Sequence, residues 1–334
     1  MVLRDKIGKM VKKGYIAPPE SKLQLLIKYF TVPKGVGDWR VVYHAGANGL
    51  NDCVWAPPFH LPTVDALLRI VDHTSVMEDR DIGEMFHNFE LHQNTRKFVG
   101  VDVRPLALGP DGPALNWLGW TKNLMGFRSS PFNSVKMYRV CEEVVRGDRH
   151  DPNNAFQWDH VRLNLPGSKN YNPSEGWLTK RRKDGTLASD VVVFVDDERV
   201  VGSGEERVVD AGHTLSSRES YLGLQDALRK LRPATKQPGA WAGVVVHNDP
   251  ALGIVVLTSQ DKWDRTKGIC QHWHRLLMEG QSELQFKELE SDRGFLVYVA
   301  NAYPAMKPYL KGFHLSLEMW RGGRDAKGWK VRGP

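Results

Sequence analysis

The stretch VVVFVDDERVVG, Val191 to Gly202, places two adjacent acidic residues inside a run of apolar residues. β-Branched and aromatic residues favour strands, and Asp is a frequent turn residue, so the pattern predicts a strand, a tight turn and a second strand. The apolar flanks indicate that this hairpin is buried on at least one face. Asp196 and Asp197 would then lie together at its tip. Two like charges held there repel each other, so the pair either raises one pKa or attracts a cation.

An Asp–Asp pair is most often only a turn, and that simpler interpretation stays open at this point. Carboxylate oxygens are hard ligands that select Mg²⁺ or Mn²⁺, but a metal site needs a further ligand from elsewhere in the chain. The segment DRDIGEMF supplies Asp81, with Asp79 as a rival on the same face of an extended strand. Three carboxylates around two Mg²⁺ ions about 4 Å apart form the site of two-metal phosphoryl transfer.

The composition of the 334-residue chain is that of a soluble globular protein with two or three subdomains. Hydrophobic residues make up 41% and charged residues 25%, and no apolar run reaches the length of a membrane span. Three well-separated cysteines and the absence of a secretory signal predict a reducing, intracellular location, in the cytoplasm or nucleus, without a membrane partner. They also argue against a disulfide framework and a cysteine zinc site.

The net charge of +7 is compatible with a polyanionic partner, although many basic proteins bind no nucleic acid. Basic residues gather in Arg4–Lys13, Lys180–Lys183 and Lys307–Arg332, and aromatic residues accompany the last group. A groove that follows a phosphate backbone uses this mixture of residues. An equally weighted alternative is that these basic residues only form solvent-exposed faces and a frayed tail.

Hydrophobic periodicity predicts an α+β fold around an antiparallel sheet, because hairpins alternate with helices in mixed order. The expected helices lie near residues 2–13, after Thr63 as a possible N-cap, before Gly147, over 220–231 and from Trp263 onward. The expected hairpins turn at residues 33–37, 94–95, 196–197 and 248–250, and residues 148–186 are expected to be irregular.

At this point the sequence resembles the reverse transcriptases. FVDD resembles their YxDD box, and DIGEMF resembles their first palm motif. The resemblance implies that Asp81, Asp196 and Asp197 are the catalytic residues and hold two Mg²⁺ ions, with Mn²⁺ as a possible substitute. It also makes Phe86 the steric gate, an aromatic ring placed where a ribose 2′-hydroxyl would lie.

Further motifs follow in the order of the family. LMGFRSSPFNS resembles the LPQGxxxSP box, WRVVYHAGANGLN resembles the WRxxxDYRxLN fingers motif, and PGAWAG resembles the primer grip. The segment from Gly294 to Arg321 looks like the thumb of retroelement polymerases. These matches imply nucleotide-binding roles for Lys34, Arg40, Met125, Gly126 and Lys236, the last as a proton donor to pyrophosphate, and primer or template contacts for Arg128 and Trp241.

The resemblance implies a right-hand polymerase with an antiparallel palm sheet, fingers and a helical thumb. The expected divisions are fingers 1–62, palm with part of the fingers 63–147, a surface insertion 148–188, palm with catalytic hairpin and primer grip 189–260, and thumb with a basic tail 261–334. The expected reaction is RNA-directed DNA polymerisation from dNTPs on a primed RNA or DNA template. The nearest relatives would be Ty3-like or DIRS-like retrotransposon polymerases.

Departures from the family pattern affect efficiency and fidelity more than reaction type. Met125 replaces the usual glutamine, His44 stands in the DYR region, and the strand before Asp81 is unusually polar. An RNA-dependent RNA polymerase is one alternative, which the bulk of Phe86 argues against. The other is an inactive, domesticated nucleic-acid-binding protein, which retention of all three carboxylates argues against.

Several other residues have a structural and a functional interpretation. His87 and His92, and also His272 and His274, lack the spacing of a zinc site and are expected to be structural or surface residues. Glu84 lies either near the triphosphate or in solvent. Trp39 and Trp241 are expected to pack, and surface exposure of Arg128 is the alternative to a template contact.

Overall fold

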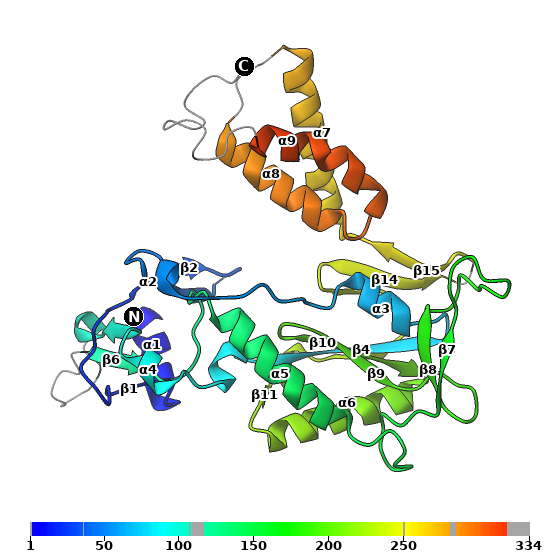
Figure 1. Cartoon of the computed structure of the whole chain (residues 1–334), viewed down its shortest axis with the longest axis horizontal. Coiled ribbons are helices and arrows are strands. Elements are labelled where there is room, and N and C mark those ends of the chain that lie inside the picture. Colours follow the sequence, from blue (N-terminus) through cyan, green and yellow to red (C-terminus); the bar gives the residue numbers. More distant parts are fainter. Residues whose placement is uncertain are drawn as a thin grey trace. The chain divides into compact units, whose positions relative to one another are not determined.

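The chain forms two compact units, each built from several separate stretches of sequence. The computed structural model describes residues 2–35, 37–106, 108, 117–249, 251–280 and 285–318 (Figure 1). The first unit comprises Met1–Leu61, Arg80–Arg149 and Gly212–Leu231, and the second comprises Pro62–Asp79, His150–Ala211 and Arg232–Pro334. Strand β4 (Ser75–Gly83) and helix α6 (Glu205–Tyr221) each contribute residues to both units.

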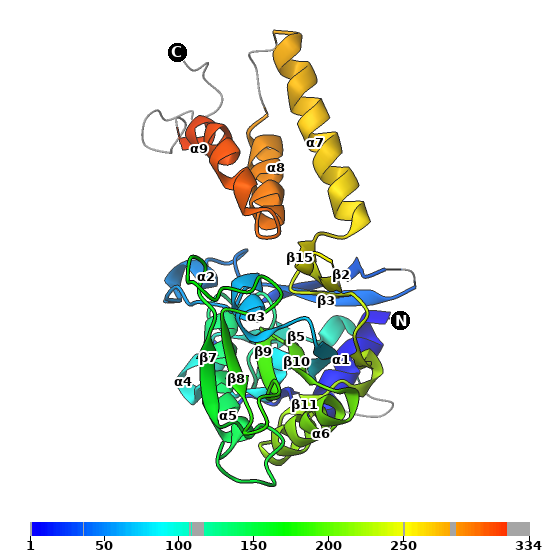
Figure 2. The same ribbon diagram turned by 90° about the vertical axis from the view of Figure 1, so that its right-hand side faces the viewer.

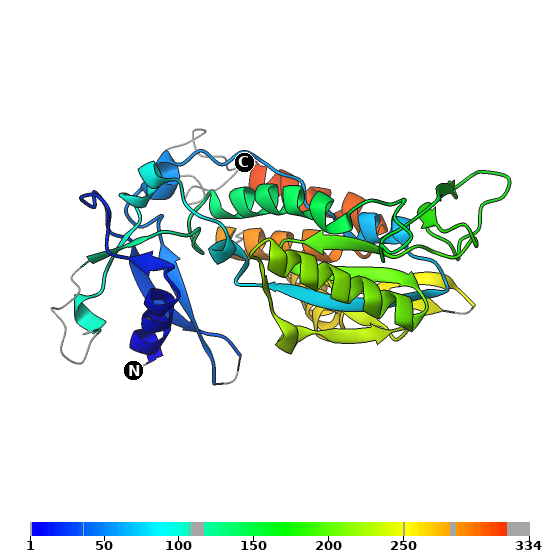
Figure 3. The same ribbon diagram turned by 90° about the horizontal axis from the view of Figure 1, so that it is seen from below.

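The first unit packs short strands and helices around a core that includes Ile7, Tyr43, Val101, Leu118 and Trp120. Figure 3 shows helix α1 alongside the hairpin of β2 and β3. The elements are α1 (Val2–Lys12), β1 (Ile16–Ala17), β2 (Lys28–Pro33), β3 (Trp39–His44), α2 (Leu50–Cys53), η1 (Met85–Asn88), α4 (Gln93–Arg96), β5 (Gly100–Asp102), η2 (Arg104–Leu106), β6 (Trp117–Trp120), α5 (Ser130–Arg146), β11 (Gln225–Asp226) and η3 (Leu228–Lys230).

The central sheet contains the hairpin that the acidic motif predicts. Its strand order is β11-β4-β10-β9, with β12 (Arg232–Thr235) also paired to β4. Strands β9 (Asp190–Phe194) and β10 (Asp197–Ser203) pair antiparallel, with Phe194 opposite Asp197, and lie side by side in Figure 2. The valines on both strands are buried, as the apolar flanks predict. The two-residue turn is formed by Val195 and Asp196, and Asp197 begins β10, so the two acids lie next to each other at the tip of the hairpin.

The second unit adds further strands and a separate helical cluster. Its remaining elements are α3 (Val64–Ile70), β7 (His160–Leu163), β8 (Leu178–Arg181), β13 (Gly239–Trp241), β14 (Val244–Asp249), β15 (Gly253–Leu257), α7 (Gln260–Met278), α8 (Phe286–Val299), η4 (Pro304–Leu310) and α9 (Lys311–Glu318). Helices α7, α8 and α9 share a core that includes Trp273, Leu289, Leu296 and Leu310. The prediction of helices from Trp263 onward is therefore confirmed within residues 263–280 and 285–318.

The α+β class and several individual elements are confirmed. Helix α5 ends at the expected glycine, because Gly147 adopts a φ of 64°, which favours glycine over other residues. Thr63 occupies the N-cap of α3, but its side chain makes no capping hydrogen bond. The part of the basic tail from residue 319 onward, with Trp320 and Trp329, lies outside the described residues, as do Val36 and Pro250 of two predicted turns.

Three secondary-structure predictions were wrong. Residues 220–231 do not form a helix: α6 ends at Tyr221, and Gly223, with a φ of 80°, turns the chain into β11. The hairpin expected at residues 94–95 is a short helix, α4, because β5 pairs with the distant β6 instead of with its neighbour in sequence. The segment expected to be irregular contains the antiparallel pair β7 and β8.

None of the helices among the described residues combines the length and the apolar character needed to cross a bilayer.

Candidate active site

The turn between β9 and β10 holds its first residue in a strained backbone conformation. Val195 has a φ of 60°, and a β-branched residue rarely adopts this left-handed region. Two-residue hairpins need a positive φ at the first central position, which glycine usually supplies. Such strain costs about 1–3 kcal/mol and persists only where the surroundings enforce it. The surrounding structure therefore fixes the backbone conformation of the turn that carries Asp196 and Asp197.

Trp241 on strand β13 supports the same turn from the side. Its indole is 4% exposed, and its Nε1 donates a hydrogen bond to the carbonyl oxygen of Asp197 at 3.3 Å. The ring of Phe194 meets it edge-on, with centroids 6.3 Å apart. This confirms the packing role expected for Trp241, and a direct contact with a primer stays a prediction. The packing role expected for Trp39 is wrong, because this residue is 40% exposed.

Asp79, the rival to Asp81 as a metal ligand, is neutralised by two arginines. The fully buried Arg199 of β10 donates from Nε to Asp79 Oδ1 at 2.6 Å and from Nη2 to Oδ2 at 2.9 Å. Arg232 adds a third bond to Oδ2 at 3.1 Å. A bidentate guanidinium pair of this kind fixes the carboxylate. The geometry therefore makes Asp79 a structural residue and favours Asp81 as the candidate ligand.

Asp81 lies in the first unit and is 5% exposed. Its carboxylate forms an ion pair with the ammonium group of Lys230, which belongs to η3. The amide of Ala227 also donates to the backbone oxygen of Asp81 at 3.0 Å. Sequence reasoning missed Lys230 because only the pairing of β11 with β4 brings this segment back to Asp81. Lys236, the proton donor proposed from sequence, is exposed.

Phe86 lies in η1, just beyond the end of β4, where its side chain is half-buried. The residue before this short helix region, Glu84, has a φ of 50° and is the second strained residue of the site region. Its carboxylate does not simply extend into solvent as one interpretation of the sequence suggested, because Lys13 and Tyr15 both bond to it.

The loop with Met125, Gly126 and Arg128 is tied to the rest of the first unit by Asn51. Asn51 Nδ2 donates to Gly126 O at 3.0 Å, and its Oδ1 accepts from the Arg128 amide at 2.9 Å. Gly126 has a φ of 93°, and a Cβ there would lie 1.9 Å from the carbonyl oxygen of Tyr43. The chain's own backbone therefore requires this glycine. Met125 is 38% exposed.

The remaining predicted nucleotide contacts lie on the hairpin of β2 and β3. Arg40 is exposed and pairs with Val32 across the ladder. Lys34 is also exposed, and its amide closes the turn on the carbonyl oxygen of Asp38 at 2.9 Å. Both cations are therefore accessible to an anionic ligand.

The predicted metal ligands are distributed over both units. Asp81 belongs to the first, and Asp196 and Asp197 belong to the second. Within the described ranges, no three His, Cys, Asp or Glu side chains form a cluster that could hold a metal ion. The chemistry of the donor set fits Mg²⁺, because all three are carboxylates and Asp81 already pairs with a cation. Their convergence on shared ions stays a prediction.

The four histidines considered as zinc ligands occupy structural or surface positions, as expected, and His92 and His274 are exposed. His87 is stacked against Trp120, with ring centroids 5.4 Å apart, and against Tyr15. Burial lowers the pKa of His87 to about 4, so the ring is neutral at physiological pH. His92 Nδ1 accepts from the amide of Asn94 at the start of α4, and His272 pairs with Glu288.

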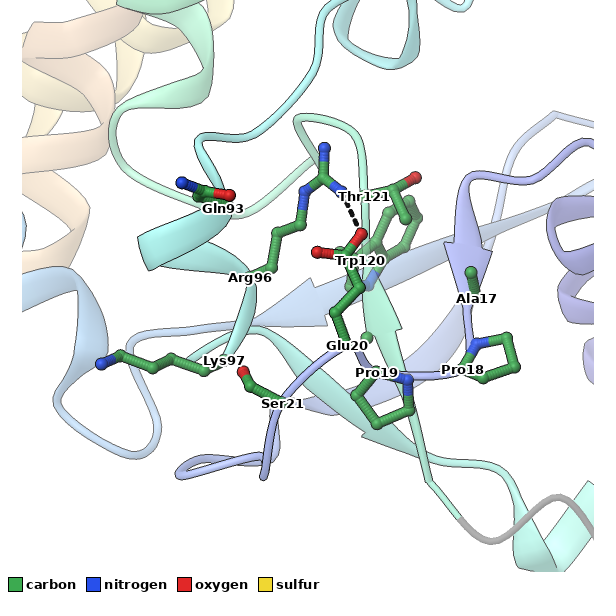
Figure 4. A pocket seen from close by; sticks show the side chains of 11 residues that line it. Ala17, Pro18, Pro19, Glu20, Ser21, Gln93, Arg96, Lys97, Trp120 and Thr121 are labelled. Carbon is green, nitrogen blue, oxygen red and sulfur yellow. Dashed lines mark hydrogen bonds and ion pairs between the residues drawn. The ribbon is translucent and has the colours of Figure 1, made fainter.

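Two hollows on the first unit contain none of the predicted site residues. The smaller, of about 390 Å³, is lined by residues that include Glu20, Arg96 and Trp120 (Figure 4). Arg96 bonds to Glu20 at 3.0 Å there and to Glu90 at 3.2 Å. The larger, of about 860 Å³, follows the apolar segment around Leu23–Leu26 and Trp117.

No protein-family model and no curated protein matches this sequence. Solved structures do match the fold. A foamy viral protease-reverse transcriptase dRH in complex with double-stranded DNA has a TM-score of 0.59 and 14% identity, over 94% of this chain and 43% of that one. A foamy viral protease-reverse transcriptase with an RNA/DNA hybrid has a TM-score of 0.56 and 13% identity, over 96% of this chain and 33% of the other. The chain thus spans less than half of each, and it has a reverse-transcriptase-like fold.

Proposed function

We propose that this chain is an RNA-directed DNA polymerase. A primer 3′-hydroxyl would attack the α-phosphate of a dNTP on an RNA or DNA template. Asp81, Asp196 and Asp197 would hold two Mg²⁺ ions, which when bound lower the pKa of the hydroxyl and neutralise charge on the leaving pyrophosphate. Arg40 and Lys34 would bind the triphosphate from the exposed hairpin of the first unit.

The observation that carries this proposal is the strained turn at Val195. A turn that served only to connect two strands would gain stability from glycine or asparagine at this position. Instead, the chain keeps a β-branched residue there, directly before two carboxylates, on a fold similar to that of reverse transcriptases. Strain held next to candidate ligands is typical of pre-organised catalytic sites.

Lys230 has a role that complements the metal ligands. Its ammonium group pairs with Asp81, so the buried carboxylate has a positive partner before any divalent ion binds. Because its side chain is 44% exposed, the lysine can move into solvent when a divalent ion replaces it as the positive partner of Asp81. We therefore infer that Lys230 compensates the charge of Asp81 until a metal ion takes its place.

The half-buried Phe86 supports dNTPs over ribonucleotides as substrates. A ring of this size would collide with a ribose 2′-hydroxyl, whereas polymerases that use ribonucleotides need a smaller or polar group. Preferential extension with rNTPs would replace this proposal by an RNA-dependent RNA polymerase. The origin of the chain in a Ty3-like or DIRS-like retrotransposon is part of the same proposal.

The deciding experiment is primer extension on poly(rA)/oligo(dT) with Mg²⁺, comparing wild type with Asp196→Asn. Loss of a metal ligand removes several kcal/mol of transition-state stabilisation, so we expect extension to fall more than about a hundredfold. Asp264→Asn is the matched control, because Asp264 is an exposed acid on α7 paired only to neighbours on its own helix. Equal activity of wild type and Asp196→Asn would refute the proposed site. Template binding without extension would indicate a nucleic-acid-binding protein.

A further inference from the structure

The turn that carries Phe86 is held by residues that lie far away in the sequence. Strand β4 ends at Gly83, and Glu84 then adopts a left-handed conformation, with φ 50° and ψ 43°. The amide of His87 bonds to the oxygen of Glu84 at 2.7 Å, and the amide of Phe89 bonds to the oxygen of Phe86 at 3.3 Å. The orientation of Phe86 therefore depends on whatever holds Glu84.

Two side chains at the end of the N-terminal helix hold the carboxylate of Glu84. Lys13 Nζ lies 2.5 Å from Glu84 Oε2, and Tyr15 OH donates to the same oxygen at 2.6 Å. The Tyr15 residue is buried, whereas the Glu84 side chain is 43% exposed. The tyrosine is therefore the rigid partner, and the lysine is a surface ion pair of smaller energetic value.

Gln225 on β11 extends these contacts into a closed ring of hydrogen bonds. Its Nε2 donates to Tyr15 OH at 2.8 Å and to Asn88 Oδ1 at 3.1 Å. Asn88 Nδ2 in turn donates to Gly83 O at 3.0 Å. The ring thus runs from Glu84 through Tyr15, Gln225 and Asn88 back to Gly83, and it encloses both ends of the turn.

Aromatic packing fixes the residue that follows Phe86. His87 stacks on Trp120 at a centroid distance of 5.4 Å, and its other neighbour is the ring of Tyr15 at 4.7 Å. Tyr15 therefore contacts the turn twice, through its hydroxyl at Glu84 and through its ring at His87. A change at Tyr15 is transmitted to residues on both sides of Phe86.

We infer that Tyr15, Glu84 and Gln225 are positioning residues that set the orientation of Phe86 and hence the discrimination against ribonucleotides. This inference rests on the proposed polymerase function and assigns it three further residues. None of the three touches the substrate in this assignment. They act by limiting how far the gate ring can move when a 2′-hydroxyl approaches.

The test compares Tyr15→Phe with wild type and with Tyr29→Phe. Tyr15→Phe deletes one hydroxyl and keeps the ring that packs on His87. Tyr29→Phe is the matched control, since that half-buried hydroxyl also donates one bond of 2.6 Å, to the Asp102 carbonyl oxygen. We expect the ratio of kcat/KM for dNTP over rNTP to fall about three- to tenfold in Tyr15→Phe, with dNTP kcat nearly unchanged, and to stay constant in Tyr29→Phe.

Two further measurements separate the inference from the proposed function. In a Phe86→Ala background, Tyr15→Phe should have no additional effect on selectivity, because the gate it positions is gone. Hydrogen exchange at the amides of His87 and Phe89 should accelerate in Tyr15→Phe, with no need for activity.

Each alternative outcome has a distinct meaning. If Phe86→Ala relaxes selectivity but Tyr15→Phe does not, the positioning inference is overturned and the polymerase proposal survives. Unchanged exchange at both amides also overturns it. If wild type extends no primer, the proposed function fails, and the assigned role in discrimination fails with it even where the exchange rates respond.

Discussion

Among the described residues, three non-glycine residues have a positive φ, namely Glu84, Val195 and Ala242, and the structure stabilises the turns of the first two by opposite means. Glu84, at the end of β4, is held by polar contacts from Lys13 and Tyr15. Val195, at the end of β9, has no polar side chain and is held by the strand ladder and by Trp241 beside Phe194. Val195 immediately precedes two proposed metal ligands, and Glu84 lies two residues before the proposed steric gate, Phe86.

The difference shows that a strained backbone can be fixed by two kinds of support with different sensitivities. Ion pairs and charge-assisted hydrogen bonds weaken when a change of pH removes a charge or when salt screens it. Apolar packing weakens when a substitution creates a cavity. We therefore expect the two turns to respond to different changes. The following predictions test that separation, beginning with the largest expected effect.

Removal of Trp241 should damage the Val195 turn most. Trp241→Ala leaves a cavity under the hairpin and removes the bond to the Asp197 carbonyl oxygen, so we expect a loss of about 3–5 kcal/mol in the free energy of unfolding. Urea denaturation measures it. The exposed Trp39 provides the control, because Trp39→Ala should change stability by no more than about 0.5 kcal/mol. Equal losses in both variants would contradict packing as the support of this turn.

Substitution by glycine should increase the free energy of unfolding at the Val195 turn and not at the Glu84 turn. Val195→Gly removes about 1–3 kcal/mol of strain at an entropic cost of about 0.5–1 kcal/mol, so we expect a net stabilisation of about 1 kcal/mol. Primer extension should nevertheless slow, since Asp196 and Asp197 become less fixed. Glu84→Gly should give no gain, because it also loses charge-assisted bonds. A stabilised Glu84→Gly variant would mean that the polar contacts contribute little.

The smallest effect should be the pH dependence of the Glu84 turn. Burial raises the pKa of Glu84, but hydrogen bonds from Lys13 and Tyr15 outweigh burial and hold the pKa below its usual value of 4.5. A lowered carboxylate pKa contributes stability that is present above pH 4.5 and is lost as the pH falls through the folded-state pKa. When denaturation is measured at a series of pH values, the free energies of unfolding of wild type and Glu84→Gln should therefore become equal at acidic pH. A difference in the free energy of unfolding that does not change with pH would show that the Glu84 carboxylate does not stabilise this turn through its polar contacts.

Local patterns in the sequence were sufficient to predict elements whose partners are near in the chain. The hairpin of β9 and β10 follows from the valines around Asp196 and Asp197, and α5 follows from its periodicity and from Gly147. In both elements, the pairing strand or the capping residue lies nearby in the sequence. The helix predicted over residues 220–231 was wrong because the strand conformation of β11 depends on a distant partner, the end of β4. The local pair of β7 and β8 was missed for another reason, because β7 is exposed along its whole length and so has no buried apolar face.

The candidate site was predictable in its residue types and not in its contacts. The motif identified Asp81 but could not exclude Asp79, since both lie on the same face of a strand. The two arginines that pair with Asp79, Arg199 and Arg232, distinguish it from Asp81, and an Arg in an apolar strand gives no sign of its partner in the sequence. Lys230 and Tyr15 were missed for the same reason, because each reaches its acid across a large separation in sequence.

The close approach at Gly126 has a consequence for how this chain can change over generations. Even alanine there would place a methyl carbon within 1.9 Å of the Tyr43 oxygen, so no side chain is sterically tolerated without moving β3. The neighbouring Met125 faces no such barrier, because its side chain is partly in solvent. Substitutions can therefore accumulate at residue 125 while residue 126 stays glycine, so that the nucleotide contact proposed for this loop could change at only one of these two adjacent codons.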